Sequence, residues 1–177
     1  MNEEQRVMTY TEFMPPFGAD FISSYDLDVL GFFDAPASTK YHGAYAGGLF
    51  DHSIEVARVL VDLTDKLGLT WSRPESPYII GMYHDLCKCD SYRYDIESDS
   101  YVYNNDQILD GHGAKSVIVA QKFIRLTDEE IACIRWHMGA FEDDPKLRNG
   151  YARACERNEN VLFTHTADMI ASKIEGI

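Results

Sequence analysis

Six histidine and aspartate side chains recur along the chain in settings that suit metal binding. A single histidine on an apolar helix face is usually a hydrogen-bonded core residue. Here the six lie on five separate segments, each at an expected helix end or flanked by small or polar residues. Imidazole and carboxylate together suit Zn, Fe, Mn or Ni. The sequence therefore predicts one metal centre built from His52, His84, Asp85, His112, His137 and Asp168.

The adjacent pair His84 and Asp85 suggests how such a centre is shared between two ions. Neighbouring side chains on a helix point about 100° apart, so the two residues face different directions. A carboxylate can bind one ion with each of its oxygens. A neutral imidazole offers one nitrogen once its other N–H is held by an acceptor. We therefore expect Asp85 to bridge two divalent ions.

The order H, HD, H, H, D resembles that of the HD-domain metal-dependent phosphohydrolases. The resemblance implies that His52, His84, Asp85 and Asp168 hold the first ion, and that Asp85, His112 and His137 hold the second. The run His84-Asp85-Leu86-Cys87-Lys88 also matches the HD-x-x-K pattern of that superfamily. The resemblance extends from about Ala35 to Asp168, which is most of the chain.

A second likeness lies just before the first histidine. The stretch Ala35-Pro36-Ala37, then Tyr41 to Tyr45 and Gly47-Gly48-Leu49, resembles the segment leading into the HD domain of bacterial exoribonucleases that pair it with an OB-fold. The first forty residues of the sequence are too few to encode an OB-fold, so we do not carry over the RNA substrate. The GYP signature of the cyclic-dinucleotide branch is also absent, which disfavours that branch.

The chemistry we expect is hydrolysis of a phosphate mono- or diester. Two close cations can lower the pKa of a bridging water and stabilise an in-line displacement at phosphorus, so a metal-bound hydroxide is the expected nucleophile. Asp85 would bridge, and Lys88 would neutralise charge on the phosphoryl group. A solvated lysine near a helix C-terminus is an equally good interpretation of Lys88. His42 could contact the substrate, although packing within its loop is the more ordinary role.

The elements that must position these residues are mostly helical. Apolar periodicity and capping signals predict five helices. The first begins with Asp51 as N-cap and ends at Gly68, and the second begins at Ser76-Pro77 and continues through His84 and Asp85 to Leu86. The other three cover about 111–124, Thr127 to Gly139, and 160–174. A short helix is expected within 20–33, and a polar loop over 142–150. Alternating tyrosines predict a β-hairpin over 92–103. The expected fold is an all-α HD-domain bundle of five or more helices with a small β-hairpin, forming one domain over 1–177 with residues 1–40 packed on it as an N-terminal extension.

Charge and composition narrow the partners. The net charge of −13 repels a polyanion, which makes long nucleic acid an unlikely partner and favours a nucleotide or another small phosphorylated molecule. The four cysteines show no disulfide or zinc spacing and are expected to be free thiols. No signal peptide or membrane-spanning run is visible, so we expect a cytoplasmic protein. The physiological metal and the oligomeric state stay open.

Two other functions compete with hydrolysis. Some HD-fold proteins with a similar order of ligands are di-iron oxygenases, and the sequence separates them from phosphohydrolases only by Lys88 and the loop resemblance. A non-catalytic nucleotide-sensing HD module is the second alternative, which the complete ligand set disfavours.

Overall fold

The computed structural model describes residues 1–15, 21–139 and 145–176, and the expected fold is confirmed in it. The described elements, in chain order, are α1 (Glu3–Phe13), α2 (Ser24–Val29), α3 (Gly48–Leu67), α4 (Ser76–Tyr83), the 3₁₀ helix η1 (Leu86–Cys89), β1 (Tyr92–Asp95), β2 (Ser100–Tyr103), α5 (His112–Ala120), α6 (Asp128–Trp136), α7 (Pro145–Arg157), α8 (Asn160–Met169) and the π-helical turn η3 (Ile170–Glu175).

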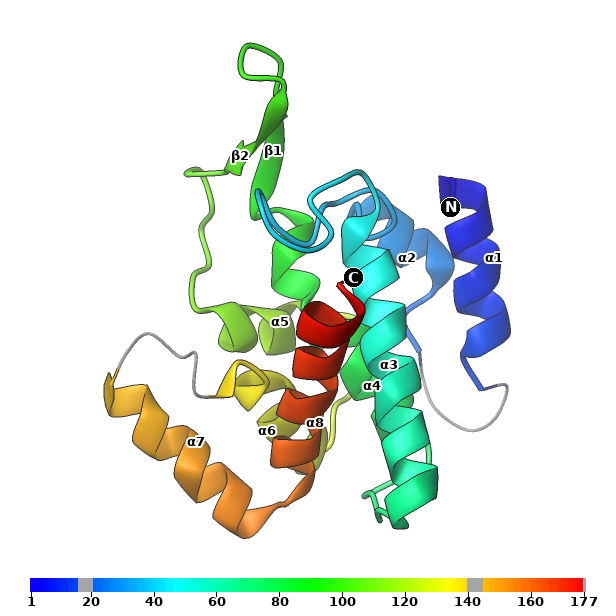
Figure 1. Cartoon of the computed structure of the whole chain (residues 1–177), viewed down its shortest axis with the longest axis vertical. Helices are drawn as coiled ribbons and strands as arrows, with labels where there is room; N and C mark the ends of the chain where they lie inside the picture. The colour runs from blue at the N-terminus through cyan, green and yellow to red at the C-terminus, as the bar shows by residue number, and fades with distance from the viewer. Residues whose placement is uncertain (16–20, 140–144, 177) are drawn as a thin grey trace.

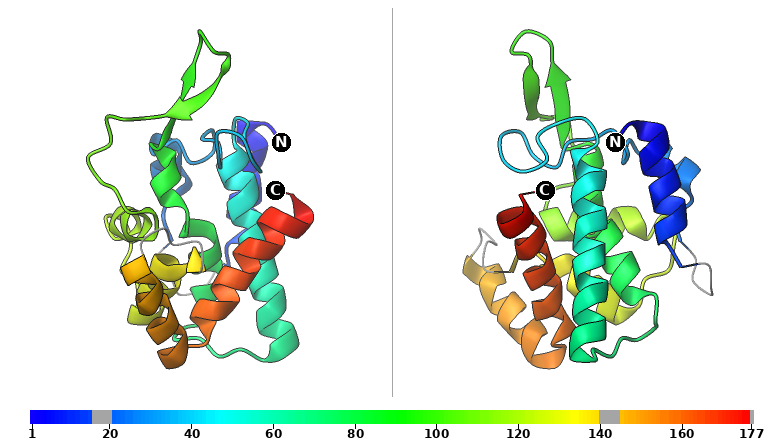
Figure 2. Two further views of the ribbon diagram at one scale, coloured as in Figure 1. Left: turned by 60° about the vertical axis from the view of Figure 1, so that its left-hand side comes forward. Right: turned by 45° about the vertical axis from the view of Figure 1, so that its right-hand side comes forward.

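The long helix α3 is the centre of the bundle. It packs against α4 on one side and against α8 and η3 on another, while α1 flanks its N-terminal half (Figure 1). The β-hairpin projects from one end of the bundle in the view of Figure 1 and in both views of Figure 2. One cluster of buried apolar side chains joins the helices, with Phe50, Leu60, Ile80 and Ile134 among its fully buried members. The helices therefore share a single core.

Helix α3 begins earlier than the sequence indicated. Asp51 is not the N-cap: Gly47 takes that position with a left-handed backbone, φ 81°, and Asp51 lies in the first turn. There it accepts hydrogen bonds from Arg6 on α1 and from Tyr45. The predicted stop is correct, because Gly68 ends the helix in the left-handed conformation. The early start adds Gly48, Leu49 and Phe50 to the helix, all of them buried.

Helix α4 lies close against α3 and ends just before the His-Asp pair. A β-carbon on Gly81 would lie 2.3 Å from the α-carbon of Ala57, so only glycine allows this approach. The prediction that His84 and Asp85 lie within the helix is wrong. Helix α4 ends at Tyr83 with His84 as its C-cap, and Asp85, at φ −111° and ψ 18°, leads into η1. The break frees the two side chains from the angle that helical neighbours must keep.

The sequence signals for α6 and for the hairpin are confirmed. Thr127 and Glu130 form a reciprocal capping box at the start of α6. Strands β1 and β2 pair antiparallel, with Tyr92 opposite Tyr103 and Tyr94 opposite Tyr101. Lys115 on α5 is buried and ion-paired with Asp90. Asp90 lies between the end of η1 and the start of β1, at the base of the hairpin. This contact ties the hairpin to α5.

Two helices were not predicted. Helix α1 buries Arg6 and Tyr10, so its inner face lacks the apolar repeat that the sequence analysis relied on. Helix α7 spans Pro145–Arg157, where a polar loop was expected as far as residue 150; residues 142–144 of that loop lie outside the described part of the chain. Gly150, which favoured a loop, lies within α7, and the close approach of the Trp136 ring there needs glycine, because a β-carbon would come within 2.3 Å of the ring.

No helix in the described part of the chain combines the length and the apolar character needed to cross a bilayer.

Candidate metal centre

Five helical segments bring the six predicted ligands to one place. His52 lies on α3, His84 at the C-cap of α4, His112 at the first position of α5, His137 at the C-cap of α6, and Asp168 near the end of α8. Asp85 is central among them and almost fully buried, with 2% of its surface exposed. His52 and Asp168 are 116 positions apart in the sequence. They meet because α3 and α8 pack against each other in the bundle.

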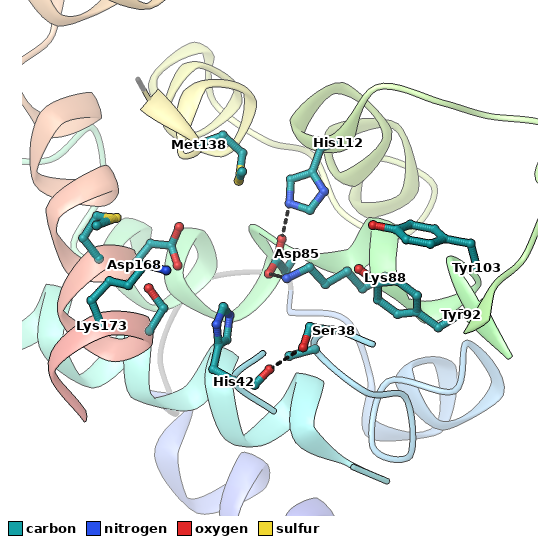
Figure 3. Close-up of a pocket in the computed structure, with 13 residues that line it drawn as sticks. Ser38, His42, Asp85, Lys88, Tyr92, Tyr103, His112, Met138, Asp168 and Lys173 are labelled. Carbon is teal, nitrogen blue, oxygen red and sulfur yellow. Dashed lines mark hydrogen bonds and ion pairs between the residues drawn. The ribbon is translucent and has the colours of Figure 1, made fainter. Parts of the chain in front are cut away.

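The two oxygens of Asp85 face different histidines. Oδ2 lies 3.4 Å from His84 Nε2 and 3.7 Å from His52 Nε2. Oδ1 lies 2.7 Å from His112 Nε2 and 3.4 Å from His137 Nε2 (Figure 3 draws the first of these contacts). Two overlapping groups result, His52–His84–Asp85 and Asp85–His112–His137, each compact enough to surround one ion.

Asp168 joins the first group through His52. Its Oδ1 atom lies 3.2 Å from His52 Nε2. His52 Nε2 also lies 3.3 Å from His84 Nε2, so these nitrogens and carboxylate oxygens converge. The six predicted ligands therefore form one continuous cluster of contacts that extends from Asp168 to His137.

Unpartnered atoms at the centre test whether these residues fit a metal. Within the described part of the chain, Asp85 Oδ1, His112 Nε2 and His137 Nε2 are buried and make no hydrogen bond of acceptable geometry, although Oδ1 and His112 Nε2 lie 2.7 Å apart. Buried polar atoms are normally satisfied, and three orphans facing one another need a common partner. A divalent cation accepts lone pairs from both imidazole and carboxylate, so the residues fit one.

The backbone fixes the orientation of two histidines. His84 Nδ1 lies 2.8 Å from the carbonyl oxygen of Gly81, and His137 Nδ1 lies 2.7 Å from that of Ile134. Because a carbonyl oxygen only accepts, each Nδ1 must donate, and in the neutral ring Nε2 is left with a lone pair directed at Asp85. Such outer hydrogen bonds are typical of metal-binding histidines.

His165 supports the centre from one turn before Asp168. Its Nδ1 atom lies 2.7 Å from the carbonyl oxygen of His137. A β-carbon on Gly139, which has a left-handed φ of 56°, would come within 2.6 Å of the same nitrogen. His165 therefore holds the turn that ends α6.

Electrostatics keep the carboxylates ionised in spite of burial. Burial by itself raises the pKa of Asp85, but the charge of Lys88 and the neighbouring histidines outweigh it and hold the pKa well below its usual range. Burial likewise opposes ionisation of Asp168, and the hydrogen bond from His52 lowers its pKa overall. Both side chains are therefore anionic at neutral pH, as metal ligands must be.

Lys88 is not the solvated lysine that the sequence also allowed. It is 8% exposed, and its Nζ atom lies 2.7 Å from Asp85 Oδ2. Burial would lower the pKa of Lys88, but the charge of Asp85 raises it overall, so the ammonium stays protonated. A positive charge therefore lies beside the Asp85 carboxylate, which both candidate ligand groups share.

A pocket of about 380 Å³ opens onto this centre. His112, Asp85 and Asp168 form its floor, Lys88 and the hairpin tyrosines Tyr92 and Tyr103 lie on one side, and Lys173 lies near Asp168 on the other (Figure 3). The volume is within the range of small-molecule sites, roughly 300–1,000 Å³.

His42 lines the same pocket from the loop before α3. Its ring centroid is 5.0 Å from that of His52. Burial and then the charge of His52 lower the pKa of His42 to about 4, so the ring is neutral at neutral pH. Its predicted contact with substrate is compatible with this position.

Sequence reasoning missed several residues of the site. Ser38, Met138 and Lys173 line the pocket without any motif that marks them. Cys87, expected to be an unremarkable free thiol, is free but lies with Sγ 3.3 Å from His112 Nδ1. Burial, followed by the charge of Asp85, raises the pKa of this thiol to about 12. No sequence signal connects two residues 25 positions apart in this way.

Comparison with protein-family models identifies an HD domain over residues 49–170, which is more than half of the chain. The chain belongs to the HD-domain family. No curated protein and no solved structure is similar enough to count as a match, so the subfamily rests on the site itself.

Proposed function

We propose that the protein is a metal-dependent phosphohydrolase that cleaves an ester of a nucleotide or another small phosphorylated molecule. One observation carries this proposal: the two oxygens of the buried Asp85 each face a different pair of histidines. This donor set suits two divalent ions that share one carboxylate. Metal ions bound in this way lower the pKa of a coordinated water and neutralise charge on a phosphoryl group.

The ligand roles follow the two groups. His52, His84, Asp85 and Asp168 would hold the first ion, and Asp85, His112 and His137 the second. Four of these side chains are almost fully buried, whereas the His112 side chain is 33% exposed at the pocket. The substrate would therefore approach from the side of His112.

The protein's own residues would bind and orient the phosphoryl group. Lys88 presents a protonated ammonium at the pocket wall, where it can donate a hydrogen bond to a phosphoryl oxygen. Its contact with Asp85 keeps the flexible side chain in place before the substrate arrives. His42, neutral at neutral pH, can donate a hydrogen bond to the substrate from the opposite loop.

The size and chemistry of the pocket support a small substrate. Tyr92 and Tyr103 line one end, with ring centroids 5.2 Å apart in an edge-to-face arrangement. An aromatic ring here could stack on a base, with the phosphate at Lys88 and Asp85. The net charge of −13 opposes a long polyanion over the rest of the surface.

A substrate panel tests the proposal. The metal-free protein would be supplied with Mn²⁺, Ni²⁺, Fe²⁺ or Zn²⁺ and assayed against nucleotides, a generic phosphodiester and single-stranded RNA. We expect turnover of a small ester that is lost in Asp85→Ala and kept in Asp62→Asn, a change at an exposed carboxylate on α3. Efficient degradation of RNA with weak turnover of every small ester would contradict the small-substrate assignment.

The same preparation separates the competing functions. An oxygenase would consume O₂ and, after anaerobic purification, show the electron-paramagnetic signal of a mixed-valent di-iron centre. A non-catalytic sensor would bind a nucleotide and turn over nothing with any of the four metals. Either result would overturn the assignment as a phosphohydrolase.

A further inference from the structure

The histidines of the two metal groups differ in what holds their outer nitrogen. His84 and His137 each place Nδ1 against a backbone carbonyl oxygen. His112 instead places Nδ1 3.3 Å from the Sγ atom of Cys87. A thiol is both a weak donor and a weak acceptor, whereas a carbonyl only accepts.

This difference affects which nitrogen of His112 carries the proton. With the thiol as acceptor, Nδ1 is protonated and the Nε2 lone pair, 2.7 Å from Asp85 Oδ1, is available to an ion. With the thiol as donor, Nε2 is protonated instead and cannot bind one. His84 and His137 have no such alternative, because their carbonyl partners allow only the first state.

The contact between Cys87 and His112 is built into the fold. The backbone N–H of Cys87 donates to Ser116 Oγ at 3.1 Å, and Ser116 Oγ donates to the carbonyl oxygen of His112 at 3.3 Å. This chain ties η1 to the first turn of α5 at the two residues concerned. Cys87 itself is 2% exposed, so water does not compete for the sulfur.

We propose that Cys87 is the positioning residue of His112: its sulfur accepts a hydrogen bond from Nδ1–H when an ion binds Nε2, and this weak acceptor makes His112 the least firmly fixed ligand of the second group. The inference rests on the proposed two-ion centre. It implies that the second ion, on the pocket side, binds more weakly than the first. It also implies that this difference depends on the group at position 87.

Zn²⁺ titration of the metal-free protein tests the proposal by calorimetry, without reference to activity. We expect two binding events in the natural protein. Cys87→Ala should weaken only one of them, by about 10–100-fold, the usual effect of removing an outer hydrogen-bond partner. Cys87→Ser, which keeps an acceptor, should restore most of the affinity. Cys89→Ala is the matched control, because it removes a thiol from the same 3₁₀ helix and should change neither event.

Nitrogen-15 spectra of histidine-labelled protein give a second measurement. In the natural protein with Zn²⁺ bound, His112 should carry its proton on Nδ1. In Cys87→Ala, the His112 signals should respond at higher Zn²⁺ than they do in the natural protein, whereas the response of His52 and His84 should not change. Signals can be assigned with His112→Gln. Zn²⁺ bound to Nδ1 of His112 would overturn the proposal.

The outcomes separate the two proposals. Two events of unchanged affinity in Cys87→Ala would overturn the role of Cys87 and leave the two-ion centre standing. Absence of Zn²⁺ binding in the natural protein would overturn both. Circular dichroism and thermal unfolding of each variant would show whether a loss of binding reflects loss of the fold. If a variant does not fold, the position of the His112 proton in spectra of the Zn²⁺-bound natural protein tests the proposal.

Discussion

Lys88 Nζ lies 2.7 Å from Asp85 Oδ2, and both side chains are almost fully buried. The same carboxylate oxygen faces His52 and His84. Asp85 is therefore the point at which the protein's fixed positive charge and the nitrogens of the candidate metal ligands meet. The consequences for metal content and for hydrolysis can be tested separately.

Asp85→Ala should be the most damaging change to metal content. It removes an oxygen from each of the two groups and leaves the charges of both ions poorly compensated. We expect elemental analysis to find loss of both ions rather than one. Near-full metal content in this variant would exclude a bridging role for Asp85.

Lys88→Met should separate metal binding from hydrolysis. Lys88 is not a ligand, and removing its charge leaves Asp85 at least as attractive to a cation, so metal content should be retained. The rate constant kcat should fall by about 10²–10³-fold, as when one preorganised electrostatic group is lost. Lys122→Met, at an exposed lysine after α5, is the control and should leave both unchanged. Full activity of the Lys88 variant would remove it from the site.

Gly81→Ala should damage the centre through packing alone. The new β-carbon would clash with Ala57 on α3, and Gly81 also supplies the carbonyl oxygen that orients His84. We expect lower stability by denaturant unfolding together with reduced metal content. Gly68→Ala is the comparison: its φ of 67° costs about 1–2 kcal/mol in strain, but nothing lies within 4 Å and no ligand is near. Normal metal content in Gly81→Ala would show that α4 can move without displacing His84.

Arg6→Ala tests how the N-terminal helix is attached. Arg6 is 5% exposed, and its guanidinium contacts Asp51 and the carbonyl oxygens of Ala46 and Phe33. Removing one partner of a buried ion pair costs about 3–5 kcal/mol, so the free energy of unfolding should fall by that order. Lys66→Ala breaks an exposed pair on α3 and should cost at most about 0.5 kcal/mol. Equal effects of the two changes would contradict a role for Arg6 in holding α1.

The sequence predicted those features that local chemistry determines. The Thr127–Glu130 capping box, the stop at Gly68 and the alternating tyrosines of the hairpin each act over a few residues, and each was found. The histidines and aspartates indicated the centre because six of them recur in the order H, HD, H, H, D, although any one of them alone would be an ordinary core residue. Their convergence around Asp85 still needed the fold.

Features that depend on distant contacts were missed for physical reasons. Helix α1 has no apolar repeat and is anchored by the guanidinium of Arg6. In α7, Gly150 leaves room for the Trp136 ring, a contact that no local pattern indicates. No local sequence signal indicates the break after Tyr83, which takes His84 and Asp85 out of the helix. Cys87 contacts His112 because the fold packs η1 against α5, a contact between segments that no local pattern predicts.

The most direct test of the central claim is a crystal structure of the protein grown with Mn²⁺, with anomalous diffraction used to locate the ions. The account predicts two anomalous peaks, one on each side of Asp85, roughly 3.5–4 Å apart as in other two-metal sites. One peak should be bound by His52 and His84, and the other by His112 and His137. Peaks at a different site, or two ions that do not share Asp85, would contradict the account.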